Sequence, residues 1–209
     1  MALSPVGGLR SAERTGEWVY GNLGSAWCGW LPRGGLCGMD DAYLDRVLIG
    51  GRERREIVIA DYDPAWPARF ETERSRIAAA LGPRALRIEH IGSTAVPGLA
   101  AKPIVDVLVE VAALDGVDLS PAGYVLRVRE DGHLMFRTPE VDVHVHVWPA
   151  GHPDIAGQLA FRDRLRASAE DRAAYEALKR ELAARDWPDV NHYADAKSEL
   201  IREIRARGG

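Results

Sequence analysis

The chain of 209 residues carries a net charge of −4 at pH 7 and is 46% hydrophobic, which is enough for one domain with its own core. This acidic balance excludes a protein that coats nucleic acid, whereas a site for one nucleotide needs only about two or three basic side chains. No apolar run approaches the ~18 residues of a membrane span, and Cys28 and Cys37 lack the spacing of a zinc site. We therefore expect a cytoplasmic protein with no membrane partner.

Residues 1–38 differ from the rest of the chain. Glycines are scattered among Trp18, Trp27 and Trp30 with no helical or strand period, which predicts a disordered or non-native extension. Met39 precedes a charged helical start, so translation beginning at Met39 is our interpretation, and a tryptophan-rich tail that binds a partner is the alternative. Residues 39–55 then form a helical lead-in to a domain at 56–209.

The regular pattern begins at Glu56. Residues 57–60 predict a short strand, Asp63-Pro64 a helix N-cap followed by proline, and Gly82-Pro83 the end of that helix. Further strands are predicted at 85–91, 103–111, 122–129, 133–138 and 141–148, with a hairpin turn at Asp131-Gly132. The C-terminal third is predicted to be helical, and Ser168 with Asp171 resembles a capping box at the start of one of its helices. The predicted fold class is α/β (α+β), a mixed β-sheet with flanking helices and a helical C-terminal region.

The tract that ends at Asp106 carries the strongest functional signal. Gly92-Ser93-Thr94 follows a predicted strand, where a Gly-Ser pair lets backbone N–H groups approach a phosphate. Asp106 lies inside the apolar run 104–109, where an ionised carboxylate needs a metal, a cation or a histidine as its partner. A second metal carboxylate would stand two residues on, on the same strand face, but Leu108 occupies that position.

The segment 141–147 alternates valine with Asp142, His144 and His146. On a strand this alternation places the three polar side chains on one face, about 6–7 Å apart per step. Two histidines at i and i+2 are typical of zinc or iron ligation, and Asp142 would add a carboxylate. The structural alternative is a solvated face, or histidines that hydrogen-bond beneath the helices. Whether the face meets Asp106 depends on strand order, which the sequence leaves open.

Three further residues complete the candidate phosphate site. Lys102 starts the Asp106 strand after a loop from Thr94 and is placed to neutralise a phosphate. Tyr193 and Lys197, at i and i+4 of the last predicted helix, share a face from which they would reach a base or phosphate in a cleft. The structural alternatives are an exposed lysine at a loop end and a core tyrosine with its hydroxyl at the rim.

These residues resemble the GrpB family, a domain that some bacteria fuse to dephospho-CoA kinase. The resemblance rests on the tract from His90 to Asp106, on the segment 142–146, and on Tyr193 with Lys197, and it covers about residues 55–207. It implies a nucleotidyltransferase-like fold of the polymerase-beta superfamily, in which Gly92-Ser93 is the glycine-serine element and Asp106 the first metal carboxylate. A link to coenzyme A biosynthesis follows from the resemblance alone.

The resemblance also implies a nucleoside triphosphate ligand, a divalent metal and transfer of a nucleotidyl group to a small acceptor, with Asp106, Asp142 and His144 as catalytic residues. Leu108 leaves the carboxylate set incomplete. The mixed set Asp106, Asp142, His144 and His146 suits one softer ion, Zn²⁺, Mn²⁺ or Fe²⁺, better than two Mg²⁺ ions. Three hypotheses follow: a transferase, an inactive module that binds a nucleotide or CoA-like ligand, and a single-metal hydrolase that uses Asp142, His144 and His146.

Overall fold

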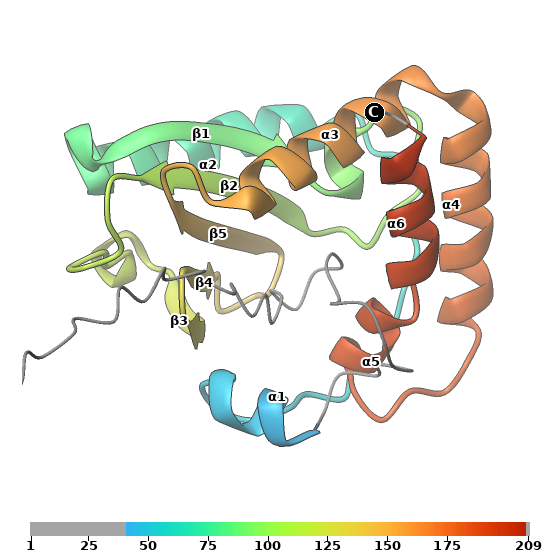
Figure 1. Ribbon diagram of the computed structural model, residues 1–209, viewed down its shortest axis with the longest axis horizontal. Helices are drawn as coiled ribbons and strands as arrows, with labels where there is room; N and C mark the ends of the chain where they lie inside the picture. The colour runs from blue at the N-terminus through green and yellow to red at the C-terminus, as the bar shows by residue number, and fades with distance from the viewer. Residues whose placement is uncertain (1–40, 208–209) are drawn as a thin grey trace, which may run out of the picture.

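The computed structural model describes residues 41–207, so the predicted extension at 1–38 lies outside the described residues. A five-stranded sheet runs through the centre in the order β1-β2-β5-β4-β3, with helices on both faces (Figure 1). The strands are β1 (Ala85–Ile91), β2 (Val105–Val111), β3 (Val125–Glu130), β4 (His133–Arg137) and β5 (Val143–Pro149). Each predicted strand from residue 85 onward is present, and the predicted mixed sheet with flanking helices is confirmed.

The sheet is mixed because β2 and β5 run parallel, whereas the other neighbouring pairs are antiparallel. In the parallel pair, Asp106 is the direct partner of His144, and Leu108 is the direct partner of His146. Paired residues on adjacent strands point to the same face of a sheet. The strand order therefore brings the Asp106 carboxylate and the two histidines together.

Helix α2 (Trp66–Leu81) covers the valine face of the sheet. Its buried face is the predicted one: Trp66, Phe70, Ile77 and Leu81. The helix begins two residues later than predicted, because Asp63 caps a preceding turn by accepting the N–H of Ala65 at 2.8 Å. Pro67, rather than Pro64, then occupies the first helical turn.

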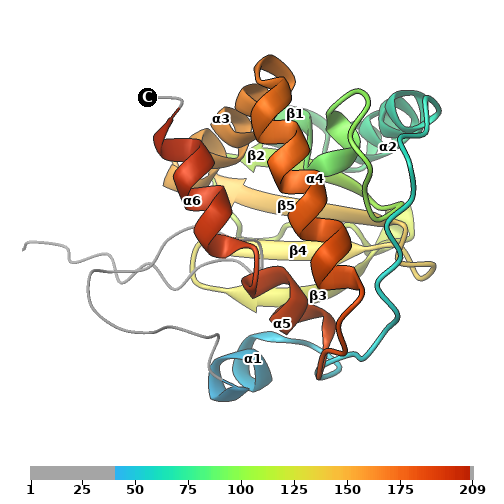
Figure 2. The same cartoon turned by 90° about the vertical axis from the view of Figure 1, so that its right-hand side faces the viewer.

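Helix α3 (Pro153–Ala167) crosses the opposite face of the sheet, and α4 (Ala169–Ala183) and α6 (Ser198–Ala206) lie side by side at one end of it (Figures 1 and 2). Ser168 caps α4 as predicted by accepting the N–H of Asp171 at 3.1 Å. We predicted a single last helix, but the structure has two: α5 (Val190–Asp195) ends before α6 begins.

The predicted strand at 57–60 is wrong. Of its residues only Ala60 pairs, in an isolated bridge with Ala101, while Val58 is 52% exposed and Ile57 faces a cavity. The segment 50–60 is instead an irregular strap between α1 (Asp41–Val47), which packs against β3, and α2 (Figure 2). Within residues 41–207, no helix has the length and apolar character to cross a bilayer.

Candidate phosphate and metal site

Gly92 follows β1 with φ 71° and ψ −172°, a backbone region used almost only by glycine. A Cβ atom built on Gly92 would come closer than 3.0 Å to Oδ2 of Asp106, a separation that real Cβ atoms essentially never show. Ser93–Ala95 follow as a single 3-10 turn, η2, and the Thr94 hydroxyl anchors this turn by donating to the carbonyl of Ile104 at 3.1 Å. The Gly-Ser turn therefore lies directly against the Asp106 carboxylate.

Asp106 is nearly fully buried, at 4% exposure, and its Oδ1 accepts no hydrogen bond from any residue in 41–207. Nδ1 of His144 lies 3.5 Å from that oxygen. Two ligands of one tetrahedral zinc ion, each about 2.0–2.2 Å from it, are themselves about 3.4 Å apart. The spacing of these two atoms therefore fits two ligands of a single ion.

Asp106, His144 and His146 are the one group among the described residues whose ligand atoms gather as a metal site requires, all within 4.8 Å of one another. Because His146 pairs with Leu108, an imidazole of the neighbouring strand stands beside the position that lacks the second carboxylate. Burial holds the pKa of His146 well below its usual range, and His133 and His144 add to the effect. The neutral imidazole is the form that binds metals.

Asp142 does not join this group. Val141 has a φ of 59°, so β5 starts only after Asp142, and the alternation that we predicted from this position is interrupted. The Asp142 carboxylate forms an ion pair with Arg69 of α2 and accepts a hydrogen bond from the Thr138 hydroxyl at 2.5 Å. The prediction that Asp142 shares a face with the two histidines is therefore wrong, because the Asp142 carboxylate is bound to Arg69 of α2.

A pocket of about 20 Å³, here called the lysine pocket, opens between the Gly-Ser turn, β2 and the C-terminal helices. Its polar lining includes Ser93, Thr94, Asp106, Lys102, Lys179 and Lys197. Nζ of Lys179 donates to Oγ of Ser93 at 3.1 Å and to the carbonyl of Ala100. Lys179 and Lys197 are each only 2% exposed. The structure thus brings the predicted Lys102 and Lys197 to the Gly-Ser turn and adds Lys179, which the sequence analysis missed.

Lysine scarcity is the signal that would have identified Lys179. Only Lys102, Lys179 and Lys197 are lysines among the 27 basic residues of the chain, and all three line this pocket. Elsewhere the chain uses arginine. An ammonium is a compact point charge with three donors, whereas the planar guanidinium is broader, so a pocket of this size accommodates lysine.

Tyr193 separates two of these lysines. Nζ of Lys102 lies 5.4 Å from the centroid of its ring, and Nζ of Lys197 lies 4.5 Å from it. Both are within the ~6 Å reach of a cation–π interaction. Because α5 ends at Asp195, Tyr193 and Lys197 do not share one helix, but they lie on the same side, as predicted, and both line the lysine pocket.

Two of the lysines have altered acid–base behaviour. Burial, reinforced by the charge of Lys197, lowers the pKa of Lys179 to about 7 and the pKa of Lys102 to about 8. In the unfolded chain both groups titrate near the ordinary lysine value, about 10.4. The folded protein therefore binds these protons less tightly than the unfolded chain does.

We expect the free energy of unfolding to rise from pH 7 to pH 9. In this range the unfolded chain binds more protons than the folded protein does. The free energy of unfolding is therefore highest above about pH 10, and it decreases as the pH falls toward the pKa values of the folded state. Each lysine contributes up to about 1.4 kcal/mol per pH unit. Urea denaturation at pH 7, 8 and 9 measures the slope. Lys179→Met should flatten it, while Arg185→Met, which removes an exposed, non-titrating cation just beyond the end of the same helix, should not; equal slopes would contradict the assignment.

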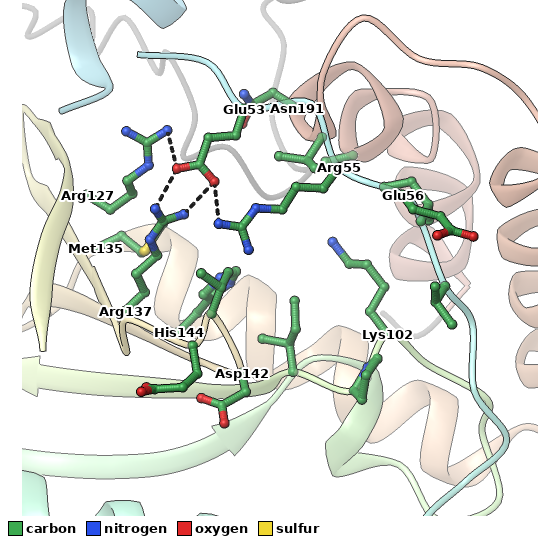
Figure 3. Close-up of a pocket in the computed structure, with 18 of the residues that line it drawn as sticks. Glu53, Arg55, Glu56, Lys102, Arg127, Met135, Arg137, Asp142, His144 and Asn191 are labelled. Atoms are coloured by element: carbon green, nitrogen blue, oxygen red, sulfur yellow. Dashed lines mark hydrogen bonds and ion pairs between the residues drawn. The ribbon is translucent and has the colours of Figure 1, made fainter. Parts of the chain in front are cut away.

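A larger cavity of about 340 Å³, shown in Figure 3, adjoins the lysine pocket, since Lys102 and Ile104 line both. His144 and Lys102 line one side of it, and the strap lines another. At one end, the Glu53 carboxylate of the strap is held by three guanidinium groups: Arg55, Arg127 and Arg137. Hydrogen bonds from Arg137 lower the pKa of Glu53 to about 2. Small-molecule pockets span about 300–1,000 Å³, so this cavity can hold a small ligand beside the metal group.

Comparison with known proteins identifies the family. The family profile described as "GrpB protein" matches residues 56–207. This chain belongs to the GrpB family. A solved structure, that of the conserved protein GrpB from Enterococcus faecalis, shares 33% identity with this GrpB chain at a TM-score of 0.65, over 72% of this chain and 96% of that one. The fold is therefore the GrpB fold, consistent with the nucleotidyltransferase-like architecture expected from the sequence.

Curated relatives extend the comparison. A UPF0157 protein of Streptomyces coelicolor is 52% identical over 167 residues, which is 78% of this GrpB chain and 89% of that protein. A dephospho-CoA kinase of Mycolicibacterium paratuberculosis is 30% identical over 188 residues, 74% of this chain but only 46% of the kinase. A GrpB-like region thus also occurs within a longer protein that is named a dephospho-CoA kinase.

Proposed function

We propose that this GrpB-family protein binds the phosphates of a nucleoside triphosphate at the mouth of the lysine pocket, with a divalent metal beside them, and transfers the nucleotidyl group to a small acceptor. The observation that carries the proposal is the convergence of three lysines and the Gly-Ser turn on one buried carboxylate. Each of these elements is suited to phosphate or to the metal that accompanies it.

The charge of the lysine pocket favours an anion. Lys102, Lys179 and Lys197 bring up to three positive charges, and Asp106 is the carboxylate in the same lining. Burial disfavours the ionised form of a lysine and the neighbouring charge of Lys197 adds to this effect, so the pKa values of Lys102 and Lys179 are lowered. A bound triphosphate would restore both ammonium charges, so binding at pH 8 should take up protons from the buffer.

Asp106, His144 and His146 would hold the metal, which supplies positive charge at the transferring phosphoryl group. In nucleotidyl transfer an acceptor oxygen bonds to the α-phosphorus, the bond from that phosphorus to the bridging oxygen breaks, and diphosphate leaves while the acceptor's proton passes to solvent. The three lysines would stabilise the charge that develops on the diphosphate. The Gly-Ser turn would position the phosphates through its backbone N–H groups.

The 340 Å³ cavity is the place for the acceptor, because His144 and Lys102 line it as well as standing at the metal group and the lysine pocket. A molecule in the cavity would therefore lie next to the phosphates. One relative is named a dephospho-CoA kinase, so coenzyme A and dephospho-CoA belong among the ligands to test.

A thermal-shift series tests the proposal. ATP, GTP, CTP, UTP, CoA and dephospho-CoA are each combined with Mg²⁺, Mn²⁺ or Zn²⁺. A ligand at 100 times its Kd adds about 2.7 kcal/mol of stability, which is a shift of several degrees for a domain of this size. We expect a nucleotide together with a metal to give a larger shift than either gives alone, and this added shift to be lost in Lys197→Met and kept in Arg180→Met. No added shift from any nucleotide would contradict the proposal, and a metal shift that no nucleotide increases would favour the single-metal hydrolase.

A second candidate function, ligand binding without transfer, is favoured by Leu108. This side chain is fully buried and packs with Ile91, Trp148 and Ile155, so the position of a second carboxylate is part of the core. With one carboxylate the site lacks the acid pair of a two-metal centre. Nucleotide binding with no turnover under any of the three metals, followed by chromatography of the nucleotide, would select this candidate.

A further inference from the structure

A chain of buried polar side chains leads from His146 into the β3–β4 hairpin. Nδ1 of His146 lies 3.1 Å from Nε2 of His133, and Nδ1 of His133 lies 2.6 Å from Oε1 of Glu130. Tyr43 of α1 donates a hydrogen bond to the other oxygen of Glu130. His133 and His146 are 3% and 2% exposed, so the chain is shielded from water.

The carboxylate at the end of this chain sets the direction of its hydrogen bonds. An ionised carboxylate only accepts, so Nδ1 of His133 would donate to Glu130, and a His133 ring that carries one proton would then accept at Nε2. Nδ1 of His146 is the donor in that second bond. The lone pair of His146 therefore lies on Nε2, which makes Nε2 the nitrogen that can ligate an ion.

We propose that Glu130 and His133 form the outer layer of a metal centre, and that they adapt the centre to an ion of the Zn²⁺ class in preference to Mg²⁺. The inference rests on the proposed function only for the place of the ion, at Asp106, His144 and His146. A carboxylate behind a ligating histidine fixes the tautomer and the ring orientation, and it raises the basicity of the ligand.

The donor set fits the same class of ion. Asp106, His144 and His146 offer one oxygen and two nitrogens, which is the three-ligand pattern of catalytic zinc sites that keep a further position for water or substrate. Mg²⁺ favours octahedral oxygen ligands and gives up its water reluctantly. Leu108 occupies the position of the second carboxylate, and its partner on the neighbouring strand is His146. The site therefore offers an imidazole nitrogen where a second carboxylate oxygen would be expected.

Packing alone does not account for Glu130. The indole of Trp148 stacks on both histidines, with ring centroids 4.7 Å from His133 and 5.4 Å from His146, and this stack does not include Glu130. The Glu130 side chain is only 6% exposed, and burial of a carboxylate is costly unless it is hydrogen-bonded. A carboxylate kept behind two stacked imidazoles is the arrangement that orients a ligand.

Titration calorimetry of the full chain with Zn²⁺, Mn²⁺ and Mg²⁺ tests the inference. We expect Zn²⁺ to bind more tightly than Mg²⁺, and Glu130→Gln and His133→Phe each to weaken Zn²⁺ binding by about 10- to 100-fold. His133→Phe keeps a ring against Trp148 while it removes both hydrogen bonds. Glu130→Asp should recover part of the affinity, and Glu199→Gln, which alters an exposed carboxylate on α6, is the control.

Co²⁺ provides a readout that a purely structural role would not change, because its visible absorption reports the geometry of its ligands. We expect the spectrum to differ between wild type and Glu130→Gln while circular dichroism stays the same. Equal Zn²⁺ affinities in wild type and both variants would overturn the inference, as would a wild-type preference for Mg²⁺. Should His133→Phe fail to fold, Glu130→Gln carries the test.

The same variants keep this inference apart from the proposed function. Binding of inorganic triphosphate in the absence of metal reports on the lysine pocket, and we expect it to be unchanged by substitutions at Glu130 and His133. Normal triphosphate binding without Zn²⁺ selectivity would sink the inference and leave the proposed function standing. Selective Zn²⁺ binding with no affinity for triphosphate or nucleotide would contradict the proposed function and leave this inference standing.

Discussion

Gly92→Ala should abolish metal-dependent nucleotide binding and lower the free energy of unfolding by about 2–6 kcal/mol. A positive φ with an extended ψ costs alanine about 1–3 kcal/mol, and the added Cβ overlaps Oδ2 of Asp106, at an overpacking cost of about 1–3 kcal/mol. This overlap can be removed only if the Gly-Ser turn or the Asp106 carboxylate moves. Either movement separates the phosphate-binding turn from the metal ligand, so stability and binding should fall together.

Gly98→Ala is the matched control for this substitution. Gly98 also has a positive φ, 76°, but a Cβ built there has no atom within 4 Å. It would bear backbone strain of about 1–2 kcal/mol without any overlap, and nucleotide binding should be unchanged. Urea denaturation gives the two stabilities, and the thermal-shift series gives the binding. Equal losses in the two variants would contradict the close approach of Gly92 to Asp106.

Asp106→Asn should remove metal binding without unfolding the protein. Loss of an outer-layer partner of a metal site costs about 10- to 100-fold in affinity, so loss of the sole carboxylate ligand should cost more than about 100-fold. Oδ1 of Asp106 accepts no hydrogen bond within 41–207, so the isosteric amide should keep the metal-free stability within about 1 kcal/mol. Calorimetry with Zn²⁺ and Mn²⁺ measures the first quantity, and urea denaturation the second.

Glu110→Gln provides the comparison for Asp106→Asn, because it neutralises a carboxylate on the same strand, four residues along and partly exposed. We expect this variant to bind metal and nucleotide as the wild type does. If Asp106→Asn retained metal-dependent nucleotide binding, or if Glu110→Gln lost it equally, the ion would have to lie elsewhere than at Asp106.

Local patterns sufficed for most of the elements. The hairpin between β3 and β4 has its own turn signal in Asp131-Gly132, and α2 has a complete apolar face between two proline-containing turns. The parallel pairing of β2 with β5 has no such local signal, since it depends on how distant segments pack. The contact of Asp106 with His144, which unites the site, could therefore be recognised only in the structure.

The site residues show where patterns stop being informative. Asp142 continues a perfect alternation in the sequence, yet the positive φ of Val141 turns it toward α2, and nothing in the residue types indicates that turn. Lys179 lies on a helix far along the chain from Lys102, so no spacing rule links them. Glu130, likewise, reaches His146 only because β4 pairs with β5.

The confinement of every lysine to one pocket changes how the protein will behave with amine reagents. Lys179 and Lys197 are almost inaccessible and Lys102 is partly buried, so acylating agents and proteases that cut after lysine should act slowly on the folded domain. Apart from the terminal amine, cross-linkers and amine coupling to a sensor surface can attach only at the lysine pocket. A sample coupled through a lysine would therefore be blocked at this pocket, and the rate of lysine modification becomes a direct gauge of whether the pocket is occupied.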